Sequence, residues 1–332
     1  MRIMKKSLLY IAVGLLATAS VVAAHQNPPG FEGGVPAVHF PPGLEPTIDG
    51  DLSEWAPIDR DIFALTNDHI RAIEGFGGLA DSYGNADASD ISVEFLYGWS
   101  DAQNKIYYGY RVFDDYHSAL RDDPGEWWWD DAMETMLMIS QLTKEEMQDL
   151  SAGGEKHNFS FNYTLPPIGG GPNAGLGWMF SGLCIRCDWV NDQTSAALDG
   201  YYEVQHTFEG SEHGESTYWY ELQTSPFLFS DTSIESPQSP GEWVTDDLDV
   251  NQVIHITQTF VDADCTIICG SPGDNSENDF LDGGYWTTTA GTGASSFGEV
   301  DIILEPIDGS IPWPDAPTAV EAKSWGRIKA QF

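Results

Sequence analysis

The stretch that decides the fold class is Ser92-Val-Glu-Phe-Leu-Tyr-Gly-Trp-Ser100, followed after Asp-Ala-Gln-Asn by Lys105-Ile-Tyr-Tyr-Gly-Tyr-Arg-Val-Phe113. Every second position of each run is aromatic or aliphatic, which is the period of a strand with one buried face. These positions are Val93, Phe95, Tyr97 and Trp99, then Ile106, Tyr108, Tyr110 and Val112. The four residues between the runs suit a hairpin turn. We therefore predict two antiparallel strands at 92–100 and 105–113.

Similar short runs, bounded by turn residues, predict further strands at 132–139, 157–165, 201–208, 217–224, 252–261 and 299–304. One helix is expected at 143–150, where Thr143 and Glu146 form a capping-box pattern. Residues 166–177 are rich in Gly and Pro and predict a long loop. Many short strands with few helical signals favour an all-β sandwich or barrel.

The N-terminal residues indicate export. Arg2, Lys5 and Lys6 precede an apolar run at 8–16 and a small-residue end at Val22-Ala23-Ala24. This is the pattern of a secretory signal peptide at 1–24, too short for a membrane span. The mature protein is thus expected to be secreted, periplasmic or attached to the cell surface. We expect a Pro/Gly-rich lead-in at 25–45 and a β domain at 46–306, followed by a Pro-rich linker and basic tail at 307–332. The tail is interpreted as a packed terminal helix or a docking peptide.

The charge of the chain limits its partners. The 332 residues include 52 acidic and 14 basic side chains, for a net charge of -38. No Lys or Arg lies between Arg186 and Lys323, so a phosphate-neutralising groove is not expected and nucleic acid is excluded as a partner. Two interpretations of the charge remain, namely a solvated surface suited to a salty medium and the capture of divalent cations by oxygen ligands.

Four cysteines occur as two close pairs, Cys184 with Cys187 and Cys265 with Cys269. In an exported protein we expect disulfides, although the sequence does not fix which cysteines pair. A tetrathiolate zinc site is the alternative, since two short-spaced pairs can also enclose a metal.

Three segments resemble the family 9 carbohydrate-binding modules and the wider DOMON-like sandwich superfamily. They are Pro46-Thr-Ile-Asp-Gly-Asp-Leu-Ser-Glu-Trp55, the two aromatic strands from Val93 to Asp115, and Trp129-Asp130-Asp131-Ala132-Met133-Glu134. The resemblance implies a two-sheet antiparallel β-sandwich, jelly-roll-like, with long loop insertions. It also implies structural calcium, a sugar slot flanked by aromatic rings, and a structural role for Trp55.

Candidate sugar ligands are tryptophans expected on loops, because the C–H face of a sugar stacks on an exposed indole. We select Trp127, Trp128, Trp129, Trp243 and Trp286. Strand alternation sends Trp128 to one side and its two neighbours to the other, so they cannot all be core. The alternative for each ring is packing beneath a loop.

Candidate calcium ligands are oxygen-bearing side chains in short clusters. They are Asp49 and Asp51 near Ser53, then Asn85, Asp87 and Asp90, and lastly Asp274, Asn275, Glu277 and Asp279. In so acidic a chain, solvated turns are the alternative for each cluster. The histidines, including His117 and His255, are interpreted as surface or core residues rather than ligands.

The resulting hypothesis is an exported, non-catalytic protein that binds a polysaccharide or oligosaccharide and holds calcium. A secreted glycoside hydrolase or its accessory subunit is one alternative, since Asp130, Asp131 and Glu134 supply carboxylates, although the sequence has no HExxH or GxSxG motif. A haem-binding electron-transfer subunit is another, with axial ligands sought among Met133, Met136, Met138 and the histidines, although no spacing points to a pair. A surface or matrix protein that has lost its ligand is the last.

Overall fold

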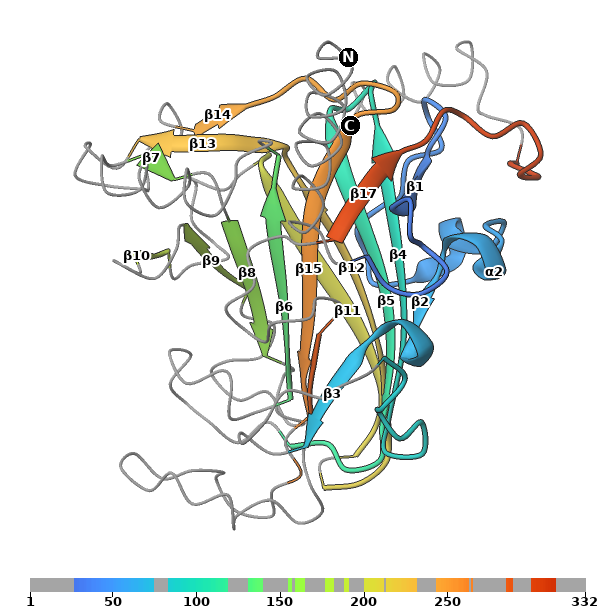
Figure 1. Ribbon diagram of the computed structural model, residues 1–332, viewed down its shortest axis with the longest axis vertical. Helices are drawn as coiled ribbons and strands as arrows, with labels where there is room; N and C mark the ends of the chain where they lie inside the picture. The colour runs from blue at the N-terminus through green and yellow to red at the C-terminus, as the bar shows by residue number, and fades with distance from the viewer. Residues whose placement is uncertain are drawn as a thin grey trace, which may run out of the picture.

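The computed structural model describes residues 27–74, 83–118, 131–139, 155–156, 159–164, 177–181, 188–190, 200–211, 213–231, 243–262, 264, 285–288 and 300–314. The backbone of these residues is mostly β-strand, with very little helix (Figure 1). No helix in these ranges has the length and apolar character needed to cross a membrane. The prediction of an all-β chain is confirmed.

The strands before the long hairpin are short and alternate with single helical turns. They are β1 (Val35–His39), η1 (Leu52–Trp55), α2 (Arg60–Phe63), β2 (Leu65–Thr66), η2 (Asn67–His69) and β3 (Arg71–Glu74). The hairpin itself is β4 (Ile91–Ser100) and β5 (Lys105–Asp114), within one residue of the predicted bounds.

The rest of the chain supplies the other strands. They are β6 (Ala132–Met138), β7 (Glu155–Lys156), β8 (Phe159–Thr164), β9 (Gly177–Ser181), β10 (Asp188–Val190), β11 (Tyr202–Gly210), β12 (Ser216–Thr224), β13 (Phe227–Asp231), β14 (Trp243–Thr245), β15 (Val253–Val261), β16 (Tyr285–Thr288) and β17 (Val300–Leu304). The strands predicted from alternation are all present. The helix expected at 143–150 lies outside the described residues.

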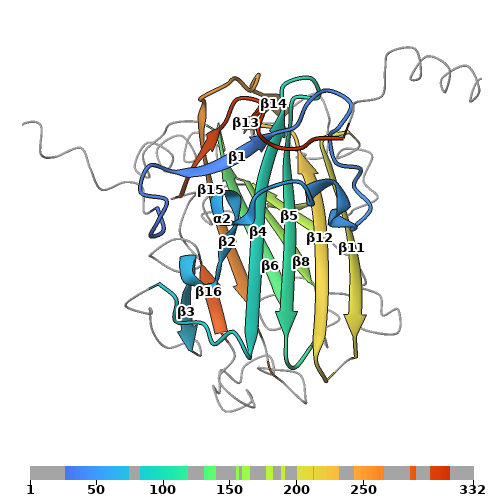
Figure 2. The ribbon, with the colours of Figure 1, turned by 90° about the vertical axis from the view of Figure 1, so that its right-hand side faces the viewer.

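Most of these strands form one curled sheet in the order β10-β9-β8-β6-β15-β17-β1-β4-β5-β12-β11. Strand β1 joins its two halves, because Val35–Ala37 pairs with β17 while Val38 and His39 pair with β4, both in parallel. The curl brings the half that holds β4, β5, β12 and β11 opposite the half that holds β6 and β15 (Figures 1 and 2).

The core lies between the two halves of the sheet. The ring of Phe95 on β4 stacks on that of Phe260 on β15, with centroids 4.6 Å apart. The hydroxyl of Tyr110 lies 3.3 Å from that of Thr135, which donates a hydrogen bond to Gln258. These buried polar groups satisfy one another across the interior, as buried polar groups must.

A second core lies on the outer side of the hairpin, where η1 and α2 cover the upper part of the sheet (Figure 2). Trp55 is fully buried there, in agreement with its expected structural role. Its ring approaches so closely that a Cβ added at Gly109 would lie 2.9 Å from it. Its indole N–H donates to the carboxylate of Glu221 at 2.9 Å.

The structure differs from expectation at residues 25–45. This stretch contains β1, so it is part of the sheet and not a lead-in. The strand was hidden because it is buried on both faces and therefore shows no alternation. Val35 and Ala37 face the core between the halves, whereas Val38 and Phe40 belong to the outer core.

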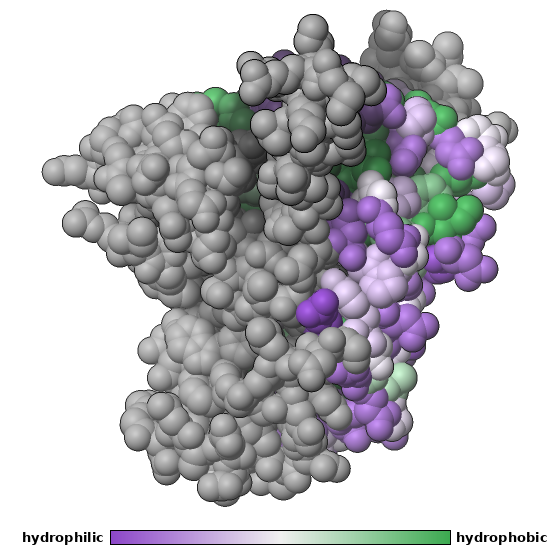
Figure 3. Space-filling view, in the orientation of Figure 1, coloured by the Kyte–Doolittle hydropathy of each residue, from purple (hydrophilic) through white to green (hydrophobic). Residues whose placement is uncertain are grey.

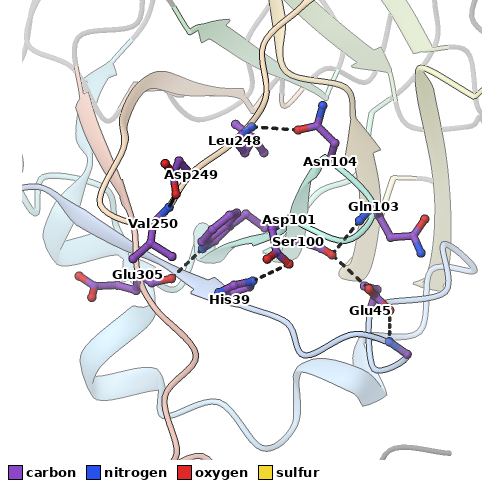
Figure 4. Close-up of polar contacts among 12 residues, drawn as sticks. His39, Glu45, Ser100, Asp101, Gln103, Asn104, Leu248, Asp249, Val250 and Glu305 are labelled. Carbon is purple, nitrogen blue, oxygen red and sulfur yellow. Dashed lines mark hydrogen bonds and ion pairs between the residues drawn. The ribbon is translucent and has the colours of Figure 1, made fainter. Parts of the chain in front are cut away.

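The closed end of the β4–β5 hairpin is held by polar contacts (Figure 4). The ring of His39 stacks on Trp99 at 4.0 Å, and its Nε2 lies 3.2 Å from a carboxylate oxygen of Asp101. The indole of Trp99 donates to the carbonyl of Glu305 on the chain after β17. Asn104, whose φ is 50°, completes the four-residue turn in the left-handed region that asparagine tolerates.

The surface of the described residues is mainly hydrophilic in Figure 3, with small hydrophobic patches. The large exposed apolar side chains among them are scattered, namely Ile62, Val244, Val250 and Ile307. Isolated apolar residues of this kind are normal on a soluble surface.

Candidate metal centre

Aspartates from three strands meet at the end of the sheet away from the closed hairpin turn. Asp114 is the last residue of β5, Asp131 precedes β6, and Asp262 follows β15. Strands β6 and β15 are antiparallel, and Ala132 pairs with Val261, so Asp131 and Asp262 flank the same end pair. Figure 1 shows the start of β6 and the end of β15 together at the bottom of the molecule.

Four further side chains complete what we call the acidic cluster: Asp90, Asp115, His117 and Asp264. Within the described part of the chain, the seven residues of the cluster form three overlapping groups of three. Within each group, one ligand atom from each residue lies within 4.8 Å of the others. The groups are Asp114, His117 and Asp131; Asp90, Asp115 and Asp264; and Asp114, Asp262 and Asp264. The cluster therefore brings six carboxylates and one imidazole into a single region.

The cluster is largely shielded from solvent. Asp114, Asp131, Asp262 and Asp264 are at most 3% exposed, His117 is 0% exposed, Asp90 is half-buried, and Asp115 is exposed. Ionised carboxylates are rarely buried unless they are paired or coordinate a metal. The burial of four of them at one point therefore requires a compensating positive charge or bound protons.

One side of the cluster has partners in the protein. His117 Nδ1 lies 3.0 Å from Oδ2 of Asp131 and 3.8 Å from Oδ2 of Asp114. The backbone N–H of Tyr116 donates to Asp114 at 2.8 Å, and that of Ser118 donates to Asp131. Two backbone donors and the nearby imidazole thus support Asp114 and Asp131, while Oδ2 of Asp114 and the ring nitrogens of His117 make no hydrogen bond that meets geometric criteria among the described residues.

The other side has much less support. Both carboxylate oxygens of Asp262 are buried without a hydrogen-bond partner among the described residues, and so is Oδ1 of Asp264. A buried acceptor without a donor costs about 1–3 kcal/mol, and more when it is charged. These oxygens lie beside Asp114, so they face other acceptors rather than donors.

The pKa values of the cluster reflect this crowding. Burial, reinforced by neighbouring carboxylates, raises the pKa of Asp90 to about 7 and those of Asp131 and Asp264 to about 8. The same two causes raise the pKa of Asp262 well above its usual range. Burial lowers the pKa of His117, but Asp114 and Asp131 outweigh burial and raise it to about 10. Without a further cation, the cluster must hold protons near neutral pH.

The donor set fits a hard divalent cation. Calcium takes 6–8 oxygen ligands, including carboxylates that bind through one or both oxygens. Six carboxylates, with the unpartnered oxygens of Asp262 among them, match this preference better than that of zinc, which favours a closed tetrahedral site of Cys and His. Asp114, Asp262 and Asp264 are the residues that would hold the ion, with Asp90, Asp115 and Asp131 within reach.

The structure places the predicted calcium ligands differently. Asp90 joins the acidic cluster. Asp49 and Asp51 lie in an exposed turn, where the Asp49 side chain accepts from the Asp51 N–H, and no described group of three ligands includes them. Asn85 and Asp87 are also exposed, and Asp87 accepts from the Ser89 backbone and hydroxyl. Asp274, Asn275, Glu277 and Asp279 lie outside the described residues.

The predicted sugar ligands are covered only in part. Trp127, Trp128 and Trp129 lie outside the described residues, as do the four cysteines Cys184, Cys187, Cys265 and Cys269 and the basic tail at 319–332. Trp243 and Trp286 were expected on loops but lie on strands β14 and β16, where the structure describes their backbone. The choice of these residues stays a prediction.

Metal binding was not predicted for Asp114, Asp115, Asp262 or Asp264, and His117 was interpreted as a surface or core residue. A signal for the aspartates was present, because each lies at or just beyond the end of an alternating run: Phe-Asp-Asp115 after one and Val-Asp-Ala-Asp264 after another. In antiparallel strands, alternate ends meet at the same edge of a sheet. Only the strand order shows which ends meet.

Known proteins offer little sequence similarity to this chain. No protein-family model and no curated protein sequence matches the chain. A solved putative carbohydrate-binding protein from Bacteroides uniformis is similar in fold, with 10% identity and a TM-score of 0.46 over 82% of this chain and 98% of that one.

Two structures of a family 9 carbohydrate-binding module from Caldicellulosiruptor kristjanssonii are also similar, each at 11% identity. The complex with glucose has a TM-score of 0.42 over 84% of this chain and 98% of that one. The complex with cellotriose has a TM-score of 0.40 over 85% and 99%. The likeness concerns the broad course of the backbone, and the sugars named are ligands of that module.

Proposed function

We propose that the protein is an exported, non-catalytic carbohydrate-binding protein whose curled β fold, an antiparallel sandwich of jelly-roll type, is fastened at one end by calcium. The signal-peptide pattern at 1–24 supports export. The cysteine pairs then meet an oxidising compartment, where disulfides form. The polysaccharide or oligosaccharide ligand stacks on the tryptophans selected from the sequence.

The observation that carries the proposal is the pair of buried Asp262 oxygens that have no donor among the described residues. Asp114 and Asp264 supply further oxygens within 4.8 Å. A divalent cation would satisfy these atoms and remove their mutual repulsion in one step. It would also tie the ends of β5 and β15 to the start of β6, three strands that belong to opposite halves of the sheet.

The carbohydrate part of the proposal is supported by where the three family-like segments lie. Trp55, which ends the first segment, packs on the β4–β5 hairpin that forms the second. The hairpin ends at Asp114, and the third segment contributes Asp131 to the same cluster. Segments far apart in sequence thus act as one structural unit, as the resemblance to the family requires.

The cluster also links calcium to the proposed sugar ligands. Trp129 is two residues before Asp131 in sequence, so a cation that fixes Asp131 also anchors one end of the segment that carries Trp127 to Trp129. Aromatic platforms bind best when they are held in place before the ligand arrives. Sugar affinity should therefore fall when calcium is removed.

The test is calorimetric titration of the mature protein with glucose, cellotriose and a panel of longer glycans, in excess CaCl2 and in EDTA. We expect binding in calcium, weaker binding in EDTA, and loss of binding in Trp128→Ala. Absence of binding to every glycan in calcium would refute the carbohydrate part. Release of reducing ends from the same glycans would instead identify a glycoside hydrolase.

A further inference from the structure

A second candidate surface lies on the outer face of the sheet, below the part that η1 and α2 cover (Figure 2). Two rows of side chains cross β4, β5, β12 and β11 there. The row nearer the cover is Glu94, Arg111, Trp219 and Thr207, and the next is Ser92, Phe113, Thr217 and Glu209. We call these two rows the outer strip.

The side chains of the outer strip point away from the core. Their neighbours in sequence, Tyr110, Val112, Tyr218 and Tyr220, are buried between the halves of the sheet, and successive residues of a strand face opposite sides. Arg111, Phe113 and Trp219 are half-buried, as expected for large side chains that lie on an open sheet. Described segments contact the strip at its two ends: the Thr207 hydroxyl donates to the Gly50 carbonyl at 2.9 Å, and Arg60 of α2 lies 3.5 Å from Glu94.

Arg111 differs in its contacts from the other cations whose side chains the structure describes, each of which has a partner. Arg60 bonds to the carbonyls of Trp55 and Ile58 and lies 3.5 Å from Glu94. Lys105 donates to Gly200 and Ser225, and the guanidinium of Arg71 lies over the ring of Tyr83.

Among the described residues, Arg111 has neither a hydrogen bond nor an ion pair, although Glu94 is directly opposite it. The carboxylate of Glu94 lies near Arg60 instead. A guanidinium presents several N–H donors in a planar fork that matches a carboxylate. The strip therefore offers an anion a donor set that the described protein does not use.

Trp219 on β12 lies directly opposite Arg111 on β5. Residues directly opposite each other in antiparallel strands have Cβ atoms about 5 Å apart, and Arg111 pairs with Trp219. That spacing is close to the width of one sugar ring, whose C–H face can lie on the indole while an attached carboxylate reaches the guanidinium. Phe113 and Thr217 flank the same position, whereas the Thr207 hydroxyl already donates to the Gly50 carbonyl.

We propose that the outer strip binds a uronic-acid residue of a polysaccharide, stacked on Trp219 with its carboxylate on Arg111. This inference rests on the proposed carbohydrate-binding function and adds a second surface with a preference for acidic sugars. The acidic group of the ligand is inferred from Arg111, the one cation among the described side chains without a hydrogen bond or ion pair to them, although Glu94 and Glu209 also belong to the strip.

The test uses the mature protein in calcium and short uronic-acid oligomers, with the methyl esters of the same oligomers as neutral counterparts. We expect the acid to bind at least about tenfold more tightly than the ester, which is the scale of one charge-assisted pair. Trp219→Ala and Arg111→Gln should each weaken binding of the acid by about tenfold or more. Arg111→Lys should recover part of the loss, since it keeps the charge without the fork.

The matched control is Gln223→Ala, which alters the same face of β12 outside the strip. It should bind the acid as the wild type does, and thermal unfolding should show that all variants are folded. Binding of cellotriose without binding of any uronic-acid oligomer would overturn this inference and leave the proposed function intact. Equal binding of acid and ester, or acid binding that survives Trp219→Ala, would also overturn it.

Discussion

Replacing Asp262 by Asn should change the stability of the protein in opposite directions with and without calcium. In calcium the variant loses a charged ligand from the centre of the acidic cluster. In EDTA it loses one of several carboxylates that repel one another at a buried position. An ordinary structural aspartate would not produce this reversal.

The size of both effects follows from the structure. Two unit charges 4.8 Å apart repel by about 3 kcal/mol at an effective dielectric constant of about 20. Bound protons relieve part of this repulsion, so we expect Asp262→Asn to stabilise the metal-free protein by about 1 kcal/mol. For a domain of this size that raises the Tm by about 2–4 °C. Calcium at 100 times its Kd stabilises the wild type by about 2.7 kcal/mol, which corresponds to about 5–11 °C, and the variant should lose most of this gain.

The assay is differential scanning calorimetry of wild type and variant at a pH near 8, in excess CaCl2 and in EDTA. The matched control is Asp61→Asn, which removes the same charge from an exposed position on α2. The control should follow the wild type under both conditions. The reasoning is refuted if calcium does not raise the wild-type Tm, or if Asp262→Asn lowers the Tm equally in calcium and in EDTA.

Three further results are expected from thermal unfolding. In EDTA the Tm should fall as pH rises from about 4 to about 8, because carboxyls with pKa values raised to about 7 or 8 hold protons that the unfolded chain releases. Calcium should make the Tm less dependent on pH. A Tm that rises over this range would contradict the assignment of a metal site. Gly109→Ala should destabilise the protein by about 1–3 kcal/mol, because its Cβ meets the ring of Trp55, whereas Gly33→Ala, where the added atom meets nothing within 4 Å, should have little effect. Phe260→Ala should lose about 3–5 kcal/mol with its stack on Phe95; a smaller loss would show that the halves of the sheet repack.

The strands could be predicted from the sequence because most of them bury one face. The runs that became β4, β5 and β12 carry large aromatic or aliphatic residues at alternate positions, which face the core between the halves, and their observed bounds lie within one residue of those predicted. Strand β1 could not be found in this way, since both of its faces are covered and Pro36 interrupts the run. Periodicity reports one-sided burial, and a strand between two cores has none.

The metal centre was harder to predict because its residues are far apart in sequence. Clusters of acidic residues within a few positions, such as Asp49 and Asp51, are exposed turns whose side chains cap the local backbone. The cluster with unpartnered oxygens instead takes Asp114, Asp131 and Asp262 from three different strands. In a chain with 52 acidic residues, the strand order and the burial of each carboxylate carry the information that local spacing lacks.

The parallel pairing of β1 has a consequence for biogenesis. Its partner β17 is the last strand of the described residues, so the edge of β1 formed by Val35–Ala37 stays open until the chain has been made as far as Leu304. Contacts this distant in sequence make folding slow. The two halves of the sheet therefore cannot be joined through β1 before β17 has emerged, and any folding intermediate that lacks β17 keeps this edge of β1 unpaired.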